Sequence, residues 1–196
     1  MIRLNQEGKA EFVELDKSTP IRTIHYSIYA LNIYSEFNNQ SNYIVGVRTS
    51  QGMGNDSHQI VIMDKDTLEV MATMDEPHLT IGFLADILQS IVTKLVPNAK
   101  ILVERNGAGV FMIDELLSRN LEEMLIYKET TGGKIYGIDL DKTVVDTTRD
   151  IISDIIRNII HIIKTEMVVD EMCEYMENNG KIPLFGICVF ASKYYK

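Results

Sequence analysis

The order of apolar runs between Tyr43 and Tyr127 constrains the fold of this chain more than any other feature. "YIVGV" (43–47) and "HQIVIMD" (58–64) are short β-branched runs on either side of a polar turn that contains glycines. "LEVMATM" (68–74) follows and alternates in the manner of a half-exposed strand. Three such runs with short connections predict an antiparallel meander.

Helical and strand patterns alternate after the meander. Thr80 predicts a helix N-cap, and apolar residues from Ile81 to Leu95 recur at helical spacing, which indicates an amphipathic helix. Next come a buried strand at "AKILVE" (99–104), a helix at "GVFMIDELLSRN" (109–120) and a short strand at "EMLIY" (123–127). This alternation predicts an α/β layer.

The two ends of the chain lead to different expectations. Residues 1–42 mix tyrosine with aliphatic residues without regular periodicity, so we expect an N-terminal arm or extension ahead of a domain at 43–196. Its Ile and Tyr side chains suit either an interface with a partner or packing on the chain's own sheet. An apolar stripe from Val144 to Ile163 predicts a long helix docked on the sheet or, alternatively, a partner-binding face. A further helix is expected at 166–180, with its acids on a solvated face.

Composition limits the function classes. At 196 residues and 45% hydrophobic content, the chain can bury one substantial core. A net charge of −9 argues against binding nucleic acid over the whole surface, but leaves open a metal site or one local basic groove. Cys173 and Cys188 lack the spacing of metal ligands, and the sequence contains no signal-peptide pattern and no Walker A motif. No apolar run approaches the roughly 18 residues of a membrane span, so we expect a cytoplasmic protein without membrane association.

Two motifs carry a resemblance to a known family. "GVRTSQGMGNDSHQIVIMD" (46–64) is similar to the first hairpin of the nuclease domain of phage large terminase subunits, in which a strand leads to an Asp, a turn of small residues and a second strand ending in Asp. "ILVERNGAGVFMIDELLSRN" (101–120) resembles that family's second motif: an apolar strand, Glu, a polar residue, Asn and then Gly before a helix. The resemblance runs from about Tyr43 to the C-terminus.

The resemblance implies an RNase H-like α/β fold, in which an antiparallel meander and then parallel strands form a mixed sheet flanked by helices. It also implies DNA cleavage with two Mg²⁺ or Mn²⁺ ions during genome packaging, in the host cytoplasm or in association with the virion. Such a centre needs carboxylates from neighbouring strands to hold two cations roughly 4 Å apart. Glu104 matches the acid of the family's second motif.

The other positions of the family's site depart from its pattern. Arg48 stands where the first Asp belongs, and a guanidinium cannot ligate a cation. Near the C-terminus, where the family has an acidic pair, this chain has Lys181, Ile182 and Pro183. We therefore predict that Glu104 is a vestigial catalytic residue and that Arg48 pairs with it through a charge-assisted contact.

Four other acids are candidate substitutes. Asp56 lies in the turn of the first motif, Asp64 ends its second strand, and Asp139 and Asp141 follow in "YGIDLDKT". Each can also be interpreted as an ordinary turn residue. If a metal is bound, the expected ligands are Glu104, Asp56 and Asp141.

The expected function is a nuclease-like module that has lost metal-dependent cleavage, uses no cofactor and binds a protein partner of a phage assembly. Weak DNA binding is also expected, with phosphate contacts from Arg105, Lys134, Lys142 and Arg149. The alternative is an active two-metal DNA endonuclease of the packaging machinery, built from substitute carboxylates. Binding of Mg²⁺ or Mn²⁺ and cleavage of plasmid DNA distinguish the two.

Overall fold

The computed structural model describes the backbone of residues 2–4 and 10–12, and residues 20–50, 57–141, 144, 146, 184, 187, 188 and 191. Its strands are β1 (Ile2–Leu4), β2 (Ala10–Phe12), β3 (Arg22–Tyr26), β4 (Tyr29–Ile33), β5 (Tyr43–Arg48), β6 (His58–Asp64), β7 (Val70–Glu76), β8 (Lys100–Val103), β9 (Tyr127–Thr130) and β10 (Gly133–Tyr136). Its helices are α1 (Ile81–Ser90), which continues into a π-helical turn at Ile91–Leu95, α2 (Gly109–Ser118) and a 3₁₀ turn at Glu122–Met124.

The predicted helices at 144–163 and 166–180 lie outside the described residues, apart from Val144 and Asp146, which are helical. In the part of the chain that is described, no helix has both the length and the apolar character needed to cross a lipid bilayer.

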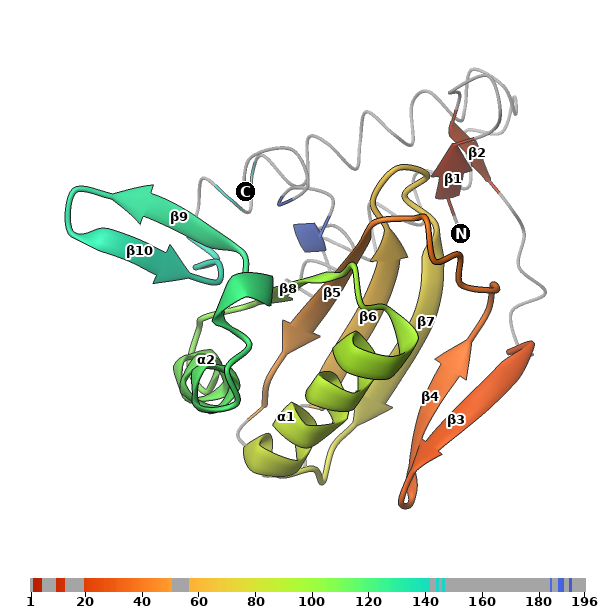
Figure 1. Cartoon of the computed structure of the whole chain (residues 1–196), viewed down its shortest axis with the longest axis horizontal. Helices are drawn as coiled ribbons and strands as arrows, with labels where there is room; N and C mark the ends of the chain where they lie inside the picture. The colour runs from red at the N-terminus through yellow and green to blue at the C-terminus, as the bar shows by residue number, and fades with distance from the viewer. Residues whose placement is uncertain are drawn as a thin grey trace.

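Strands β3 to β8 form one mixed sheet in the order β3-β4-β7-β6-β5-β8 (Figure 1). Neighbouring strands are antiparallel except β5 and β8, which run parallel. Beyond β8, Leu125 makes one further parallel bridge with Ile101. A meander that continues into parallel neighbours, with helices against the sheet, confirms the predicted RNase H-like α/β fold class.

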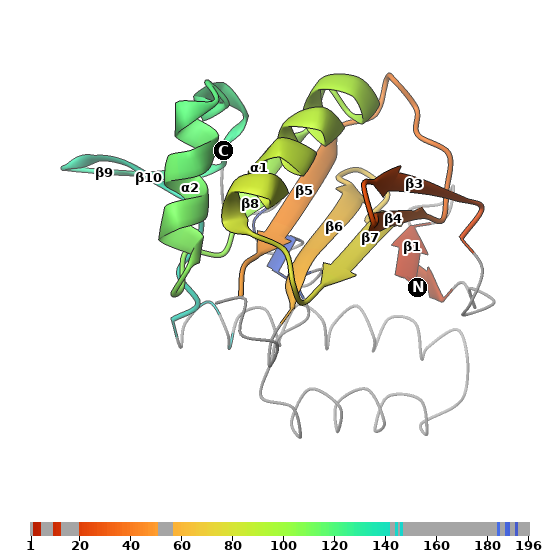
Figure 2. The same ribbon diagram turned by 90° about the horizontal axis from the view of Figure 1, so that it is seen from below.

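One face of the sheet is covered by α1 and α2, which lie on the same side of it (Figure 2). Helix α1 begins where the sequence predicts, because the Thr80 hydroxyl accepts a hydrogen bond from the backbone N–H of Phe83 at 3.3 Å. Arg119 then ties the two helices together. Its guanidinium donates to Asp86 of α1 at 2.8 Å and also to Glu115 of α2. The larger apolar core lies between these helices and the sheet.

The opposite face of the sheet carries a second, smaller apolar cluster. Because strand side chains alternate, Ile44 and Leu102 belong to this cluster, whereas Val45 and Val47 belong to the core under α1. Four helical residues from the C-terminal region complete the smaller cluster: Leu184, Ile187, Cys188 and Ala191. Their spacing places them on one side of a helix.

Gly46, in the middle of β5, lies directly under this C-terminal cluster. A Cβ at Gly46 would be 2.3 Å from Cys188 Sγ and 3.3 Å from Leu184 Cγ. Close packing therefore explains a glycine inside a strand at this position. Burial raises the pKa of the Cys188 thiol to about 12, against the opposing effects of the Arg48 charge and the Gly46 backbone. The thiol is thus protonated at neutral pH.

The N-terminal segment differs from the expectation of an irregular element. Residues 22–33 form β3 and β4, a hairpin at the edge of the main sheet, and Leu31 and Ile33 are fully buried. Tyr26 packs on the same core, whereas Ile28 at the hairpin turn is 82% exposed. Periodicity missed these strands because only part of each is buried. The domain boundary between residues 42 and 43 stays a prediction.

A second hairpin, formed by β9 and β10, projects away from the main sheet (Figure 1). The strand predicted at 123–127 is wrong for Glu123 and Met124. These two residues belong to the 3₁₀ turn, and Leu125 makes only the single bridge with Ile101. The glycine pair in "TTGGK", a common hairpin-turn composition, is the signal that the sequence did contain.

Gly46→Ala is expected to lower the free energy of unfolding by about 1–3 kcal/mol, because the added methyl group overlaps Cys188 Sγ. In a Cys188→Ala background the same glycine substitution should cost less, since the sulfur is gone. Urea unfolding of the four chains, followed by circular dichroism, measures the difference. Equal costs in the two backgrounds would show that Cys188 does not lie on Gly46.

Candidate functional site

The parallel pairing of β5 and β8 brings the ends of both strands to one edge of the sheet. Val47 is paired with Val103, so the next residues, Arg48 and Glu104, lie side by side. The Glu104 backbone N–H donates to the Val47 carbonyl at 2.9 Å, which extends the pairing by one residue. Because strand side chains alternate, Arg48 lies on the sheet face opposite α1 and α2.

Arg48 and Glu104 form an ion pair in which Arg48 Nε donates to Glu104 Oε2 at 2.6 Å. The two side chains are only 18% and 14% exposed. Salt and water therefore screen this contact less than a surface pair. The predicted contact between the two residues is confirmed.

The ion pair belongs to a row of polar side chains that crosses four strands. Arg48 Nη1 donates to Gln59 Oε1 on β6 at 3.4 Å, and Gln59 Nε2 donates to Asp75 Oδ2 on β7 at 3.0 Å. Neither Gln59 nor Asp75 was predicted as a site residue from the sequence. Gln59 is recognisable as a polar residue within an apolar run, but the register that places it opposite Arg48 comes only from the structure.

Local constraints shape the loop after Glu104. Gly107 has a φ of +60°, a conformation that favours glycine. A Cβ on Gly109 would lie 1.8 Å from the Glu104 carbonyl oxygen, so α2 can begin this close to β8 only with glycine there. Asn106 Oδ1 accepts a hydrogen bond from the Leu140 N–H at 2.8 Å. The "NGAG" segment of the second motif thus has a structural role.

Asp139 lies near this edge of the sheet, because Ile138 makes a parallel bridge with Glu104. Its carboxylate pairs with a different residue: Arg105 Nη1 donates to Asp139 Oδ2 at 2.8 Å. The bridge therefore places Asp139 one residue from the partner of Glu104. Its carboxylate, however, forms an ion pair with Arg105.

Asp64 and Asp141 have turn and capping roles. Asp64 Oδ1 accepts hydrogen bonds from the backbone N–H groups of Asp66 at 2.9 Å and Thr67 at 3.0 Å, in the turn between β6 and β7. This turn lies at the end of β6 away from Arg48, so Asp64 does not join Glu104. Asp141 Oδ1 accepts from the Val144 N–H at 2.9 Å, as a helix cap does.

The two described candidates for phosphate contact each have an acidic neighbour. Arg105 pairs with Asp139, and Lys134 Nζ on β10 lies 3.8 Å from Glu122 Oε1. Lys134 Nζ also lies 4.6 Å from the centroid of the Tyr127 ring, a cation–π arrangement. Several further candidates lie outside the described residues: Asp56, Lys142, Arg149 and positions 181–183.

Within the described residues, no three His, Cys, Asp or Glu side chains gather as they would to hold a metal ion. At the ends of β5 and β8, one carboxylate is joined to one guanidinium. A two-metal centre needs several carboxylates converging on two cations. The residues at the two strand ends therefore do not fit such a centre.

His58 begins β6 and lies on the other face of the sheet, under α1. It is 1% exposed, and its Nδ1 accepts a hydrogen bond from the Ser50 N–H at 3.3 Å. Burial lowers the pKa of His58 below its ordinary value of 6.5, while the Leu79 backbone acts in the opposite direction. The imidazole is therefore neutral at pH 7.

Fold and strand-end geometry together define an RNase H-like α/β domain with an ion pair at the ends of its central parallel strands. The chain is similar to solved structures of the large terminase nuclease from thermophilic phage G20c. One match covers 63% of this chain and 85% of that one, at 10% identity and a TM-score of 0.40. The forms with bound cobalt and magnesium each match with a TM-score of 0.48, at 13% and 12% identity, and cover 74% and 72% of this chain and 67% and 65% of theirs. No protein-family model and no curated protein matches the sequence.

Replacing Arg48 by Met should lower the free energy of unfolding by about 1–3 kcal/mol, because the largely buried Glu104 carboxylate then lacks its charged partner. Combining it with Glu104→Gln should cost less than the sum of the two single losses, by about 1 kcal/mol or more. Urea unfolding at pH 7.5 measures all four chains. Losses that add within about 0.5 kcal/mol would rule out a stabilising ion pair.

The stability of the chain should depend on pH through His58. The folded state holds this imidazole neutral, so below about pH 6.5 the unfolded chain binds more protons and stability falls as the pH drops. The free energy of unfolding, measured in urea between pH 7.5 and 5.5, should therefore fall more steeply for the parent chain than for His58→Gln. Parallel pH curves for the two chains would exclude this role of His58.

Proposed function

We propose that this chain is a terminase-nuclease-like domain that has lost metal-dependent DNA cleavage and acts as a binding module in a phage assembly. The observation that carries the proposal is the ion pair between Arg48 and Glu104. The resemblance of the two motifs to those of phage large terminase nucleases assigns catalytic carboxylates to these two strand-end positions.

Electrostatics give the reason why cleavage is lost. A divalent cation bound to Glu104 would lie close to the Arg48 guanidinium, whose Nε is 2.6 Å from Glu104 Oε2. At about 5 Å and an effective dielectric constant of about 20, the repulsion between charges of two and one is roughly 7 kcal/mol. A cation would have to displace Arg48 before it reached the carboxylate.

A protein partner is the proposed binding target. The chain carries a net charge of −9, and Arg105 and Lys134 each have an acidic neighbour. A few such basic residues give weak nucleic-acid binding that salt readily removes. A partner protein of the phage assembly, recognised by shape and polar complementarity, is the better match for an acidic domain of this kind.

The second candidate function is DNA cleavage with substitute carboxylates. One observation favours it: the bridge between Ile138 and Glu104 brings Asp139 to the same edge of the sheet. Asp139 would have to leave Arg105, and a further acid such as Asp56 or Asp141 would have to complete the ligand set. The measurements of metal binding and plasmid cleavage described next distinguish the two functions.

Millimolar Mg²⁺ or Mn²⁺ is expected to leave the melting temperature of the parent chain unchanged, because Arg48 neutralises Glu104. A ligand at 100 times its dissociation constant would add about 2.7 kcal/mol, a shift that differential scanning fluorimetry detects easily. Glu104→Gln is the matched control, since it removes the carboxylate charge while keeping the side-chain shape. A Mn²⁺-dependent rise in the parent chain that disappears in Glu104→Gln would overturn the proposal.

Arg48→Asp should bind Mn²⁺ more tightly than the parent chain, since it replaces the repelling charge with a possible ligand. Neither chain should nick supercoiled plasmid DNA, because two metals need more carboxylates than Glu104 and the one introduced by the substitution would supply. Agarose-gel assays with Mg²⁺ and with Mn²⁺, and with Arg48→Asn as the uncharged control, measure this. Metal-dependent nicking by the parent chain would instead establish the endonuclease.

A further inference from the structure

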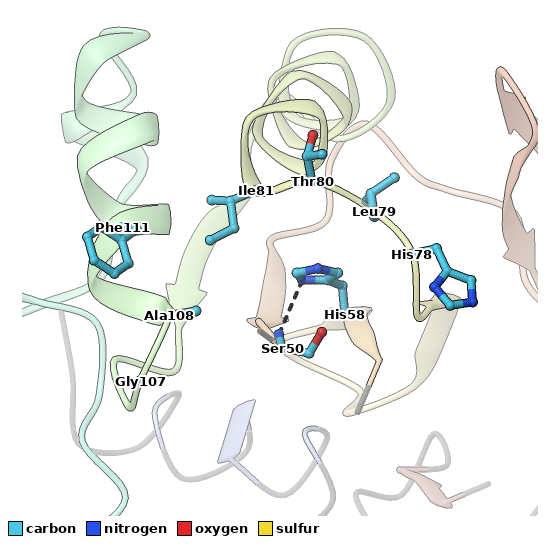
Figure 3. Close-up of a pocket in the computed structure, with 9 residues that line it drawn as sticks. All are labelled: Ser50, His58, His78, Leu79, Thr80, Ile81, Gly107, Ala108 and Phe111. Carbon is cyan, nitrogen blue, oxygen red and sulfur yellow. Dashed lines mark hydrogen bonds between the residues drawn. The ribbon is translucent and has the colours of Figure 1, made fainter. Parts of the chain in front are cut away.

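A cavity of about 700 Å³ opens on the α1 and α2 side of the sheet, on the face opposite the Arg48–Glu104 pair. Its walls come from the beginnings of both helices and from the adjoining ends of β5 and β6 (Figure 3). The described residues that line it are Ser50, His58, His78, Leu79, Thr80, Ile81, Gly107, Ala108 and Phe111.

Two helix N-termini meet at this cavity. Thr80 and Ile81 begin α1, and Gly107 and Ala108 precede α2. The first backbone N–H groups of a helix have no acceptor within the helix, and its dipole makes this end partly positive. Neither helix has an acidic residue in its first turn, and α2 has no side-chain cap. Such paired ends favour an anion over a neutral ligand.

The charge of the lining agrees with that preference. The chain as a whole has 28 acidic residues against 19 Lys and Arg. Among the described residues that line the cavity there is no Asp or Glu, and two are histidines. In a chain with a net charge of −9, the described part of the lining thus contributes no acidic group that would repel an anion.

His58 gives an independent indication of a ligand. Its side chain rises from β6 toward the start of α1 (Figure 3). Because Nδ1 accepts from the Ser50 N–H, the neutral ring carries its proton on Nε2. That nitrogen is buried and has no acceptor in hydrogen-bond geometry, although the Leu79 backbone lies near enough to raise the pKa of the ring; Thr49 Oγ1 is likewise buried without a hydrogen bond. Buried polar atoms without a partner are rare in proteins and often mark a place where a ligand or water belongs.

The remaining walls are apolar and include an exposed aromatic ring. Leu79, Ile81 and Ala108 contribute aliphatic surface, and Phe111 in the first turn of α2 is 65% exposed. Exposed aromatic side chains bind planar ring systems by stacking. The volume of the cavity also falls within the range of small-molecule sites.

We propose that this cavity binds a phosphate monoester joined to a planar ring, the chemistry of a 5′-nucleotide. The phosphate lies at the two helix N-termini near His58, and the ring lies against Phe111. A free mononucleotide and the 5′-terminal nucleotide of a nucleic acid share this chemistry. The site is independent of the proposed loss of cleavage, because it lies on the other face of the sheet.

The first experiment is calorimetric titration of the full chain with AMP, GMP, CMP and dTMP. At least one should bind, and its nucleoside should bind at least about tenfold more weakly, because the helix ends attract the phosphate. Comparison of a 5′-phosphorylated oligonucleotide with the same oligonucleotide lacking the phosphate then shows whether the cavity binds the 5′-terminal nucleotide of a nucleic acid as well as a free mononucleotide. Failure of all four mononucleotides to bind, or equal binding of the nucleoside, would overturn the inference.

The second experiment uses matched substitutions at exposed Thr80. Asp and Asn are both good N-cap residues, so each preserves the start of α1. Thr80→Asp should weaken binding of the mononucleotide about tenfold or more through repulsion, whereas Thr80→Asn should change it less than about threefold. Phe111→Ala should weaken it several-fold without unfolding the chain. Equal affinities of Thr80→Asp and Thr80→Asn would refute a phosphate at this helix end.

Discussion

The parallel pairing of β5 with β8 is the contact on which the arrangement at the strand ends depends. It joins residues separated by 56 positions, Arg48 and Glu104, through the backbone of the sheet. Both faces of β5 are buried: Val45 faces the core under α1, and Gly46 lies under the C-terminal cluster. A slip of one residue would turn Arg48 toward the core and remove the space that Gly46 provides. Core packing thus fixes the geometry of the ion pair.

The sequence was sufficient for those parts of the fold whose signals are local. The Thr80 cap begins α1 as predicted, and the runs that form β5, β6 and β8 are continuous and strongly apolar. Strands β3 and β4 were not predicted because their residues are only partly buried, so the alternation of apolar and polar residues that marks a strand is unclear there. The secondary-structure propensities of residues 122–124 likewise did not predict that they form a 3₁₀ turn.

The sequence predicted the candidate site only where a motif indicated which residues of different strands lie side by side. Similarity to two motifs placed Arg48 beside Glu104, and the ion pair followed from their charges. Gln59 and Asp75 were missed because a short segment of sequence does not predict which residues lie opposite each other on neighbouring strands. Asp64 was a candidate ligand because it ends a strand, but it lies at the end of β6 away from Arg48 and accepts hydrogen bonds within its own turn.

The contact between Gly46 and Cys188 has a consequence for how the chain is made. The smaller cluster on β5 and β8 includes Leu184, Ile187, Cys188 and Ala191, whereas β8, the later of the two strands, ends at Val103, about 80 residues earlier. At about 5–20 residues per second, a ribosome takes roughly 4–16 s to synthesise that interval. During this time Ile44, Met63 and Leu102 lack the side chains that cover them in the finished fold. The nascent chain therefore passes through a stage in which part of one face of its sheet lacks its apolar cover, and transiently exposed apolar surface of this kind is prone to aggregation.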